Sequence, residues 1–191
     1  MKKLFLALIA SVMIAAPAMA AISVGAELGL GIAFSDGLED ADFGDKIGFP
    51  IINVNAMYYI DGVNIGANPI GVGLHVGYDR LYSFEASDLF GKVESTISEI
   101  PIMVMAELRP IAAPLFINVG LGLNIVDVST EIMGYETSAS ETDFGFLVGA
   151  GYAVRINDKM EVPVGIRYNM TFVENNSVGQ LQLTAGFTYK L

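Results

Sequence analysis

The sequence predicts an all-β fold, an eight-stranded antiparallel up-and-down transmembrane β-barrel. The chain of 191 residues is 53% hydrophobic and only 16% charged, whereas ordinary soluble domains carry about 25% charged residues. Beyond the first twenty residues, polar or glycine positions interrupt every apolar run before it reaches the roughly 18 residues that a membrane helix needs. A closed barrel is the other structure that satisfies its backbone hydrogen bonds in lipid.

The second observation is a two-residue alternation, which is clearest at residues 180–191. Leu181, Leu183, Ala185, Phe187, Tyr189 and Leu191 share one face, and the residues between them are polar or glycine. Such alternation is the pattern of a strand with one apolar side. We therefore expect this strand to present its apolar side to a lipid environment.

The N-terminus carries the features of a secretory signal. Lys2 and Lys3 precede an apolar run at residues 4–16, and Ala18-Met19-Ala20 supplies the small residues that a signal peptidase reads. We expect residues 1–20 to be a cleavable signal peptide and residues 21–191 to be the barrel domain. A retained N-terminal membrane anchor is the alternative.

Composition excludes two other classes. The net charge of −11 is opposite in sign to what a nucleic-acid partner requires. There is no cysteine, so a disulfide framework and a lipid-modified N-terminal cysteine are both excluded.

Alternation of apolar with small or polar residues defines each strand in turn. The first is the longest uninterrupted example and runs from Ile22 to Phe34. In the fourth, Pro101 cannot donate to a ladder, so the strand should be unpaired or bulged there. The predicted strands are residues 22–34, 49–60, 69–82, 93–108, 114–126, 143–156, 160–173 and 180–191.

Connectors between these strands alternate in character. Residues 61–68, 109–113 and 157–159 are predicted short turns, and residues 35–48, 83–92, 127–142 and 174–179 are predicted polar loops. Several of the polar loops are acidic, with Asp36, Glu39, Asp40, Asp42 and Asp45 in the first. With an even number of strands, the termini meet on the side of the short turns, so we expect the acidic loops to face out of the cell.

The polar face of the strands consists mostly of Gly, Ala, Ser and Asn, which suits a crowded interior better than a water-facing exterior. The alternative is a soluble ligand-binding barrel of the lipocalin kind, in which the apolar face points inward and the polar face points outward. Aromatic residues of the apolar face fall near strand ends, as in the girdles of bilayer-spanning barrels. These predicted girdle residues are Phe34, Tyr78, Phe144 and Phe172 at the outer rim and Tyr58, Tyr152 and Tyr189 at the inner rim.

Three segments carry a resemblance to a known family. Glu99-Ile100-Pro101-Ile102, Val119-Gly120-Leu121-Gly122 and Val148-Gly149-Ala150-Gly151-Tyr152 resemble strands of the small outer-membrane β-barrel proteins, OmpA-like and OmpX-like, of Gram-negative-type bacteria. Thr184, Gly186, Tyr189 and Leu191 are similar to the C-terminal signal that the barrel assembly machinery reads, although that signal commonly ends on an aromatic residue. The resemblance implies insertion in the outer membrane, with a role as anchor, adhesin, resistance factor or narrow pore.

Charged residues on the polar face are the candidate site. Unpaired charges in a narrow lumen are costly, so we expect a hydrogen-bonded network of mixed sign that fills the barrel. Its predicted members are Glu27, His75, Glu107, Arg155, Glu161, Arg167 and Lys190. The competing interpretation is that these charges line a water thread through a narrow passive pore.

The sequence contains little that indicates catalysis or metal binding. His75 is the only histidine, and the residue two positions later is Gly77, so the His-x-Ser arrangement of barrel lipid A deacylases is absent. A lipid-modifying enzyme is therefore the third hypothesis, and no cofactor is expected. The acidic loops lack the regular spacing of a calcium loop, yet they could capture divalent cations or surface ligands. The predicted function is structural or surface-interacting, adhesion or resistance in type, with a largely plugged lumen.

Overall fold

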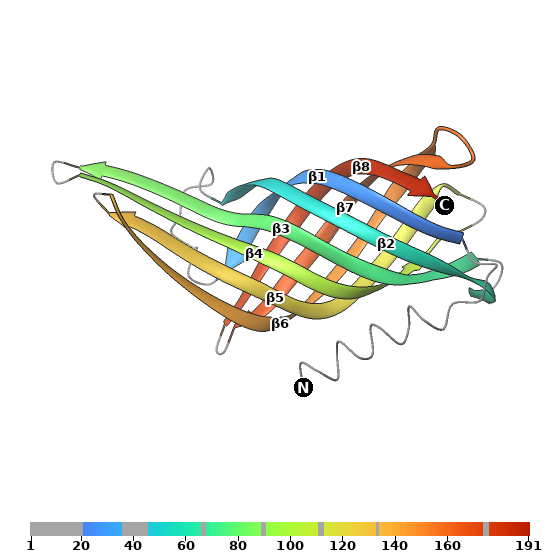
Figure 1. The fold of residues 1–191 in the computed structure, drawn as a ribbon, viewed down its shortest axis with the longest axis horizontal. Helices are drawn as coiled ribbons and strands as arrows, with labels where there is room; N and C mark the ends of the chain where they lie inside the picture. The colour runs from blue at the N-terminus through green and yellow to red at the C-terminus, as the bar shows by residue number, and fades with distance from the viewer. Residues whose placement is uncertain are drawn as a thin grey trace.

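The computed structural model describes residues 21–35, 46–65, 68–88, 91–110, 113–132, 134–173 and 176–191. Over these residues the chain forms one closed antiparallel barrel of eight strands, in which each strand pairs with the next and β8 pairs with β1 (Figure 1). The predicted fold class is thereby confirmed. The strands are β1 (Ala21–Ser35), β2 (Ile47–Ile65), β3 (Asn68–Asp88), β4 (Gly91–Leu108), β5 (Leu115–Ile132), β6 (Tyr135–Arg155), β7 (Met160–Val173) and β8 (Asn176–Lys190).

Side chains alternate between a polar lumen and an apolar exterior. On the exterior, Leu28 and Leu121 are 62% and 59% exposed, whereas inward-facing residues such as His75 and Asn118 are buried. This sense is opposite to that of a lipocalin-like barrel, so that alternative is wrong. Transfer of each such leucine from water to lipid contributes roughly 1.5–3 kcal/mol, so the exterior is suited to a bilayer. Among the described residues there is no helix with the length and hydropathy to span a membrane.

Two ends of the barrel can be distinguished. The terminal end carries the start of β1 and the end of β8, and Leu191 N donates there to Ile22 O at 2.9 Å. The distal end carries the β3–β4 and β5–β6 hairpins, which Figure 1 shows as long ribbons reaching away from the barrel. The predicted signal peptide, residues 1–20, and most of the first acidic loop, residues 36–45, lie outside the described residues.

The two distal hairpins are longer than the sequence predicted. Strands β3 to Asp88 and β4 from Gly91 replace most of the predicted loop at residues 83–92, and strands β5 to Ile132 and β6 from Tyr135 replace that at residues 127–142. Pairing continues there because a ladder requires only backbone groups, while the side chains become polar and obscure the alternation. The predicted connector at residues 61–68 and the predicted loop at residues 174–179 are likewise shortened by strand pairing.

These extensions form a four-stranded antiparallel sheet beyond the barrel, which we call the projecting sheet: residues 81–88, 91–98, 126–132 and 135–143. Pairing of β2 with β3 stops at Ile51 and Asp79, and pairing of β6 with β7 starts only at Phe144 and Phe172. The outer strands of the projecting sheet, from β3 and β6, therefore each have an edge without a β2 or β7 neighbour.

A β-bulge in β3 breaks the two-residue alternation of inward and outward side chains. The register between β3 and β4 shifts between Arg80 and Tyr82, so Leu81 is an extra residue, and its side chain is 2% exposed. The sequence predicted an irregularity at Pro101. In the β3–β4 register, Val76 pairs with Ile102 and the next pair is Asp79 with Glu99, so no β3 residue pairs with Pro101. Pro101 is thus unpaired on the β3 side, as expected for a residue without an N–H, but the bulge itself lies at Leu81.

Candidate functional site

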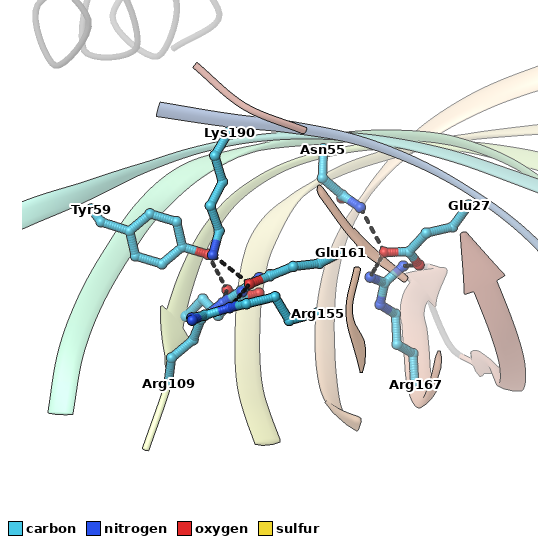
Figure 2. A network of polar contacts seen from close by, with 9 residues as sticks. Glu27, Asn55, Tyr59, Arg109, Arg155, Glu161, Arg167 and Lys190 are labelled. Carbon is cyan, nitrogen blue, oxygen red and sulfur yellow. Dashed lines mark hydrogen bonds and ion pairs between the residues drawn. The ribbon is translucent and has the colours of Figure 1, made fainter. Parts of the chain in front are cut away.

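The middle of the lumen is held by an ion pair between Glu27 of β1 and Arg167 of β7, which are 6% and 2% exposed. Arg167 Nη2 donates to Glu27 Oε1 at 2.7 Å, and Nη1 lies 2.6 Å from Oε2 (Figure 2). The pair thus combines one charge-assisted hydrogen bond, which is roughly twice as strong as a neutral one, with a second close contact between the charged groups. The structure therefore brings together two of the residues that the sequence placed in the lumen.

This ion pair spans β8, which lies between β1 and β7, and a glycine makes the crossing possible. Gly186 of β8 is opposite Glu27 in the register. A Cβ atom at Gly186 would lie 2.6 Å from Glu27 Cγ and 2.7 Å from Glu27 Cα. The glycine thus leaves the space in which the Glu27 side chain reaches Arg167.

His75 joins the same network through an amide. Its Nδ1 lies 2.7 Å from Asn55 Oδ1, and Asn55 Nδ2 donates to Glu27 Oε1 at 3.0 Å. Asn55 therefore connects the histidine to the carboxylate of the central ion pair. The sequence did not single out Asn55, although its phase in β2 already placed it on the polar face.

A second cluster of charged and polar side chains lies at the terminal end of the lumen (Figure 2). Arg109 Nε donates to Glu107 Oε1 at 2.6 Å, and Tyr59 Oη donates to the same oxygen at 2.5 Å. Glu161 accepts from both Arg109 Nη1 and Lys190 Nζ. Two carboxylates are thus matched by two cations, which offsets the cost of removing them from water.

Arg109 is the residue that sequence reasoning missed in this cluster, because it follows the last residue of β4 and was assigned to a connector. Its guanidinium lies over the Tyr59 ring at 5.3 Å. Burial by itself would lower the pKa of Arg109, but Glu107, Tyr59 and Glu161 raise it above its ordinary value. The residue is therefore a fixed cation at the terminal end.

Arg155 stands apart from this cluster. Its side chain is 66% exposed, and its Nε lies 3.9 Å from Glu161 Oε1, a distance at which an exposed pair contributes little. It borders an open hollow of about 610 Å³ at the terminal end, which Arg109, Glu161 and Lys190 also line.

Between the two clusters lies a small cavity. The cavity that Glu27, Met57, Glu107 and Arg167 border has a volume of only about 20 Å³, which is room for roughly one water molecule. Met57, Met103, Met105 and Leu147 pack together next to it.

A third cluster lies toward the distal end and was not predicted. Glu99 accepts from Asn169 Nδ2 at 2.5 Å and from Thr171 Oγ1 at 2.7 Å. Asp79 accepts from Gln182 Nε2 at 2.6 Å. Both carboxylates are in phase with the polar faces of their strands, so alternation placed them inward, but it could not show which strands they would face.

The predicted girdle residues lie on the exterior. Phe34, Phe144, Phe172 and Tyr152 are between 43% and 51% exposed, and Tyr78 and Tyr189 are 38% and 36% exposed; Tyr58 is half-buried. The Phe144 and Phe172 rings stack with centroids 6.2 Å apart. Of the predicted assembly signal, Thr184 points into the lumen, while Tyr189 and Leu191 lie outward and are exposed.

No site for a metal with three or more His, Cys, Asp or Glu ligands is present within the described ranges of the chain. A closed barrel with an apolar exterior, a polar hydrogen-bonded lumen and exterior aromatic residues defines a bilayer-spanning β-barrel. The family model for the outer membrane protein beta-barrel domain matches residues 6–190. The chain belongs to this family and is accordingly an outer-membrane protein.

Solved structures show the same fold at low sequence identity. Neisserial surface protein A aligns with a TM-score of 0.56 and 17% identity over 90% of this chain and 99% of that one. Ail, the attachment invasion locus protein of Yersinia pestis, in complex with the heparin analogue sucrose octasulfate, aligns with a TM-score of 0.58 and 15% identity over 89% and 99%. A major outer membrane protein from Thermus thermophilus aligns with a TM-score of 0.57 and 15% identity over 90% and 99%. No curated protein matches at a significant level.

Proposed function

We propose that this protein is a non-enzymatic outer-membrane barrel that acts through its surface, with the projecting sheet outside the cell and in contact with a basic partner. The observation that carries the proposal is the projecting sheet itself. A pore needs only a barrel wall, whereas these four strands continue well past the last β6–β7 pair, Phe144–Phe172.

The projecting sheet is strongly acidic on one face. Glu85 is opposite Glu94, Glu94 is opposite Glu131, and Glu131 is opposite Glu136 in the registers of β3 to β6. We call these four residues the glutamate row. Glu131 and Glu136 are like charges directly opposite each other, which destabilises a sheet, and a cationic partner would relieve that cost.

The other features of the projecting sheet suit a polypeptide partner. Phe84, Val128 and Tyr135 lie an odd number of positions from Glu85, Glu131 and Glu136, and therefore on the opposite face of the sheet; Tyr135 is 82% exposed. Residues 135–143 of β6 have no β7 neighbour, so an extended segment could add to this edge by strand pairing. A basic extended segment could pair its backbone with this edge of β6 and place its cations near the glutamate row.

The lumen supports the same role. The Glu27–Arg167 pair and the terminal-end cluster cross the barrel where a pore would need an open path. His75 contacts an amide, Asn55, and not a hydroxyl nucleophile, which favours a structural histidine over a lipid-modifying enzyme.

The same proposal includes secretion of the protein and its assembly in the outer membrane. Residues 1–20 would direct secretion across the inner membrane and be removed. Thr184, Gly186, Tyr189 and Leu191 would engage the barrel assembly machinery, and the apolar exterior would contact outer-membrane lipid. Divalent cations at the acidic loops are a competing surface ligand.

The partner chemistry differs from that seen in one structural neighbour. The Ail structure contains a heparin analogue, sucrose octasulfate, which is a polyanion. The glutamate row would repel such a ligand, so the proposal for this chain is a cationic partner.

The test is a titration of the refolded barrel, in vesicles of uncharged lipid, with an oligolysine peptide and separately with sucrose octasulfate. We expect the peptide alone to bind. Glu131→Gln together with Glu136→Gln should weaken binding roughly fivefold, because each exposed ion pair contributes about 0.2–1 kcal/mol. Glu141→Gln, on the opposite face of β6, is the matched control and should change binding less than about twofold. Equal effects of the two variants, or no peptide binding, would contradict the proposal.

A further inference from the structure

The open hollow at the terminal end has a cationic wall and an apolar wall. Its volume is about 610 Å³, which lies within the roughly 300–1,000 Å³ of small-molecule sites. Arg109, Arg155 and Lys190 form the cationic wall, and the rest of the lining is mostly apolar, with residues such as Pro114 and Leu115. Ligand sites typically combine apolar walls with a few polar groups that converge on one point.

The charges around this hollow do not cancel. Glu161 accepts hydrogen bonds from Arg109 and Lys190, and Glu107 accepts one from Arg109. Arg155 lies beside this group (Figure 2), but its Nε is 3.9 Å from Glu161 Oε1 and its side chain is mostly exposed. Three cations thus face two carboxylates, and Arg155 is the cation in excess. The hollow is suited to an anion, although the whole chain has a net charge of −11.

The hollow also reaches the lipid-facing exterior at the level of the inner aromatic girdle. Leu115 is directly opposite Tyr152 in the β5–β6 register, and both side chains are on the exterior, 46% and 48% exposed. Ala153, the next residue of β6, lines the same hollow but is buried on the lumen side. Girdle tyrosines sit at the level of the lipid headgroups. The hollow therefore extends from the mouth of the lumen to the headgroup region of the adjacent leaflet.

The basic residues of the chain are concentrated at this end. Eight of the ten Lys and Arg residues follow residue 20, and four of these eight lie at the terminal end: Arg109, Arg155, Lys159 and Lys190. Lys159 lies in the turn before β7, next to Asp158, with its Nζ 5.8 Å from the centre of the Tyr189 ring. Basic groups at the surface of a leaflet attract anionic lipids, and basic pockets bind their headgroups.

We propose that this hollow binds one anionic phospholipid of the adjacent leaflet, with the lipid phosphate at Arg155 and Lys190 and an acyl chain along Leu115. The guanidinium of Arg155 suits a phosphate because it can donate two parallel hydrogen bonds to the phosphate oxygens. A free phosphate would use only the cationic wall, whereas a lipid also covers the apolar wall. The site lies at the opposite end of the barrel from the projecting sheet and is independent of any surface partner.

The experiment reconstitutes the refolded barrel in nanodiscs of equal parts phosphatidylcholine and phosphatidylglycerol, and native mass spectrometry identifies the lipid that stays bound. We expect one phosphatidylglycerol molecule per chain. Arg155→Gln should weaken its retention roughly fivefold, the loss expected for one Lys or Arg at an anionic lipid surface. Lys159→Gln is the matched control, because it removes the same charge from the same end but does not line the hollow; it should change retention less than about twofold.

Two outcomes would overturn the proposal directly. One is retention of phosphatidylglycerol no better than that of phosphatidylcholine. The other is an equal loss in Arg155→Gln and Lys159→Gln, which would indicate general attraction to a charged surface. A separate titration with glycerol 3-phosphate, the soluble counterpart of the headgroup, distinguishes the source of the phosphate. If glycerol 3-phosphate binds the wild type and not Arg155→Gln, while no lipid is retained, the ligand is a soluble phosphate and the lipid proposal is wrong.

Discussion

The central ion pair offers the most quantitative prediction, because both of its members are buried and their charged groups are in direct contact. With Arg167 Nη2 and Glu27 Oε1 2.7 Å apart, the centres of charge lie about 4 Å apart, which gives roughly 4 kcal/mol of attraction at an effective dielectric constant near 20. Removal of one partner of a buried pair leaves the other charge uncompensated and typically costs about 3–5 kcal/mol.

We therefore expect Arg167→Met to lower the free energy of unfolding by about 3–5 kcal/mol. The assay is urea unfolding of the barrel in lipid vesicles, followed by tyrosine fluorescence and by migration of the unheated protein on gels. The double variant, Glu27→Gln with Arg167→Met, should recover part of the loss because no uncompensated charge remains.

The control for this prediction is Glu141→Gln, an exposed residue, which should change stability by less than about 0.5 kcal/mol. The reasoning would be refuted if Arg167→Met were as stable as the wild type. It would also be refuted if the double variant were less stable than Arg167→Met, because the two residues would then contribute independently and not as a pair.

Three further predictions concern closure, assembly and conductance. Gly186→Ala should destabilise the barrel by about 1–3 kcal/mol, because the added Cβ would meet the Glu27 backbone. Gly120→Ala is the control: the atom nearest to its added Cβ is Cγ of the flexible Met105 side chain, at 3.2 Å. This control should have a smaller effect in the same unfolding assay. Replacement of Tyr189 and Leu191 by aspartate should abolish outer-membrane assembly while secretion continues, as measured by fractionation; unchanged outer-membrane levels would show that these residues do not form the signal. In a planar bilayer the refolded wild type should give no conductance steps, and regular steps would establish the narrow pore instead.

The strands and their faces could be predicted because a two-residue alternation is a local property of the sequence. That periodicity was sufficient to place Glu27, Arg167 and Glu161 on the lumen side. It could not show which charges meet, because Arg167 reaches Glu27 across the intervening strand β8, and that contact depends on closure and on Gly186.

The errors also have physical causes. The projecting sheet was taken for loops because the side chains of residues 127–142 do not follow the apolar alternation of the barrel, although the backbone ladder continues to Ile132 and Tyr135. Arg109 was assigned to a connector, yet a long side chain just beyond β4 can fold back into the lumen. Asp79 and Glu99 were seen on the polar face, but their pairing became visible only with the β3–β4 register.

The orientation of the barrel is the most direct test of a surface role, and the absence of cysteine makes it simple to measure. Ser138→Cys places a thiol on the projecting sheet, and Asp158→Cys places one in the turn before β7 at the terminal end; both positions are exposed. On intact cells, a membrane-impermeant maleimide should label Ser138→Cys and not Asp158→Cys. Labelling of Asp158→Cys alone would contradict the account, because the projecting sheet would then face the periplasm.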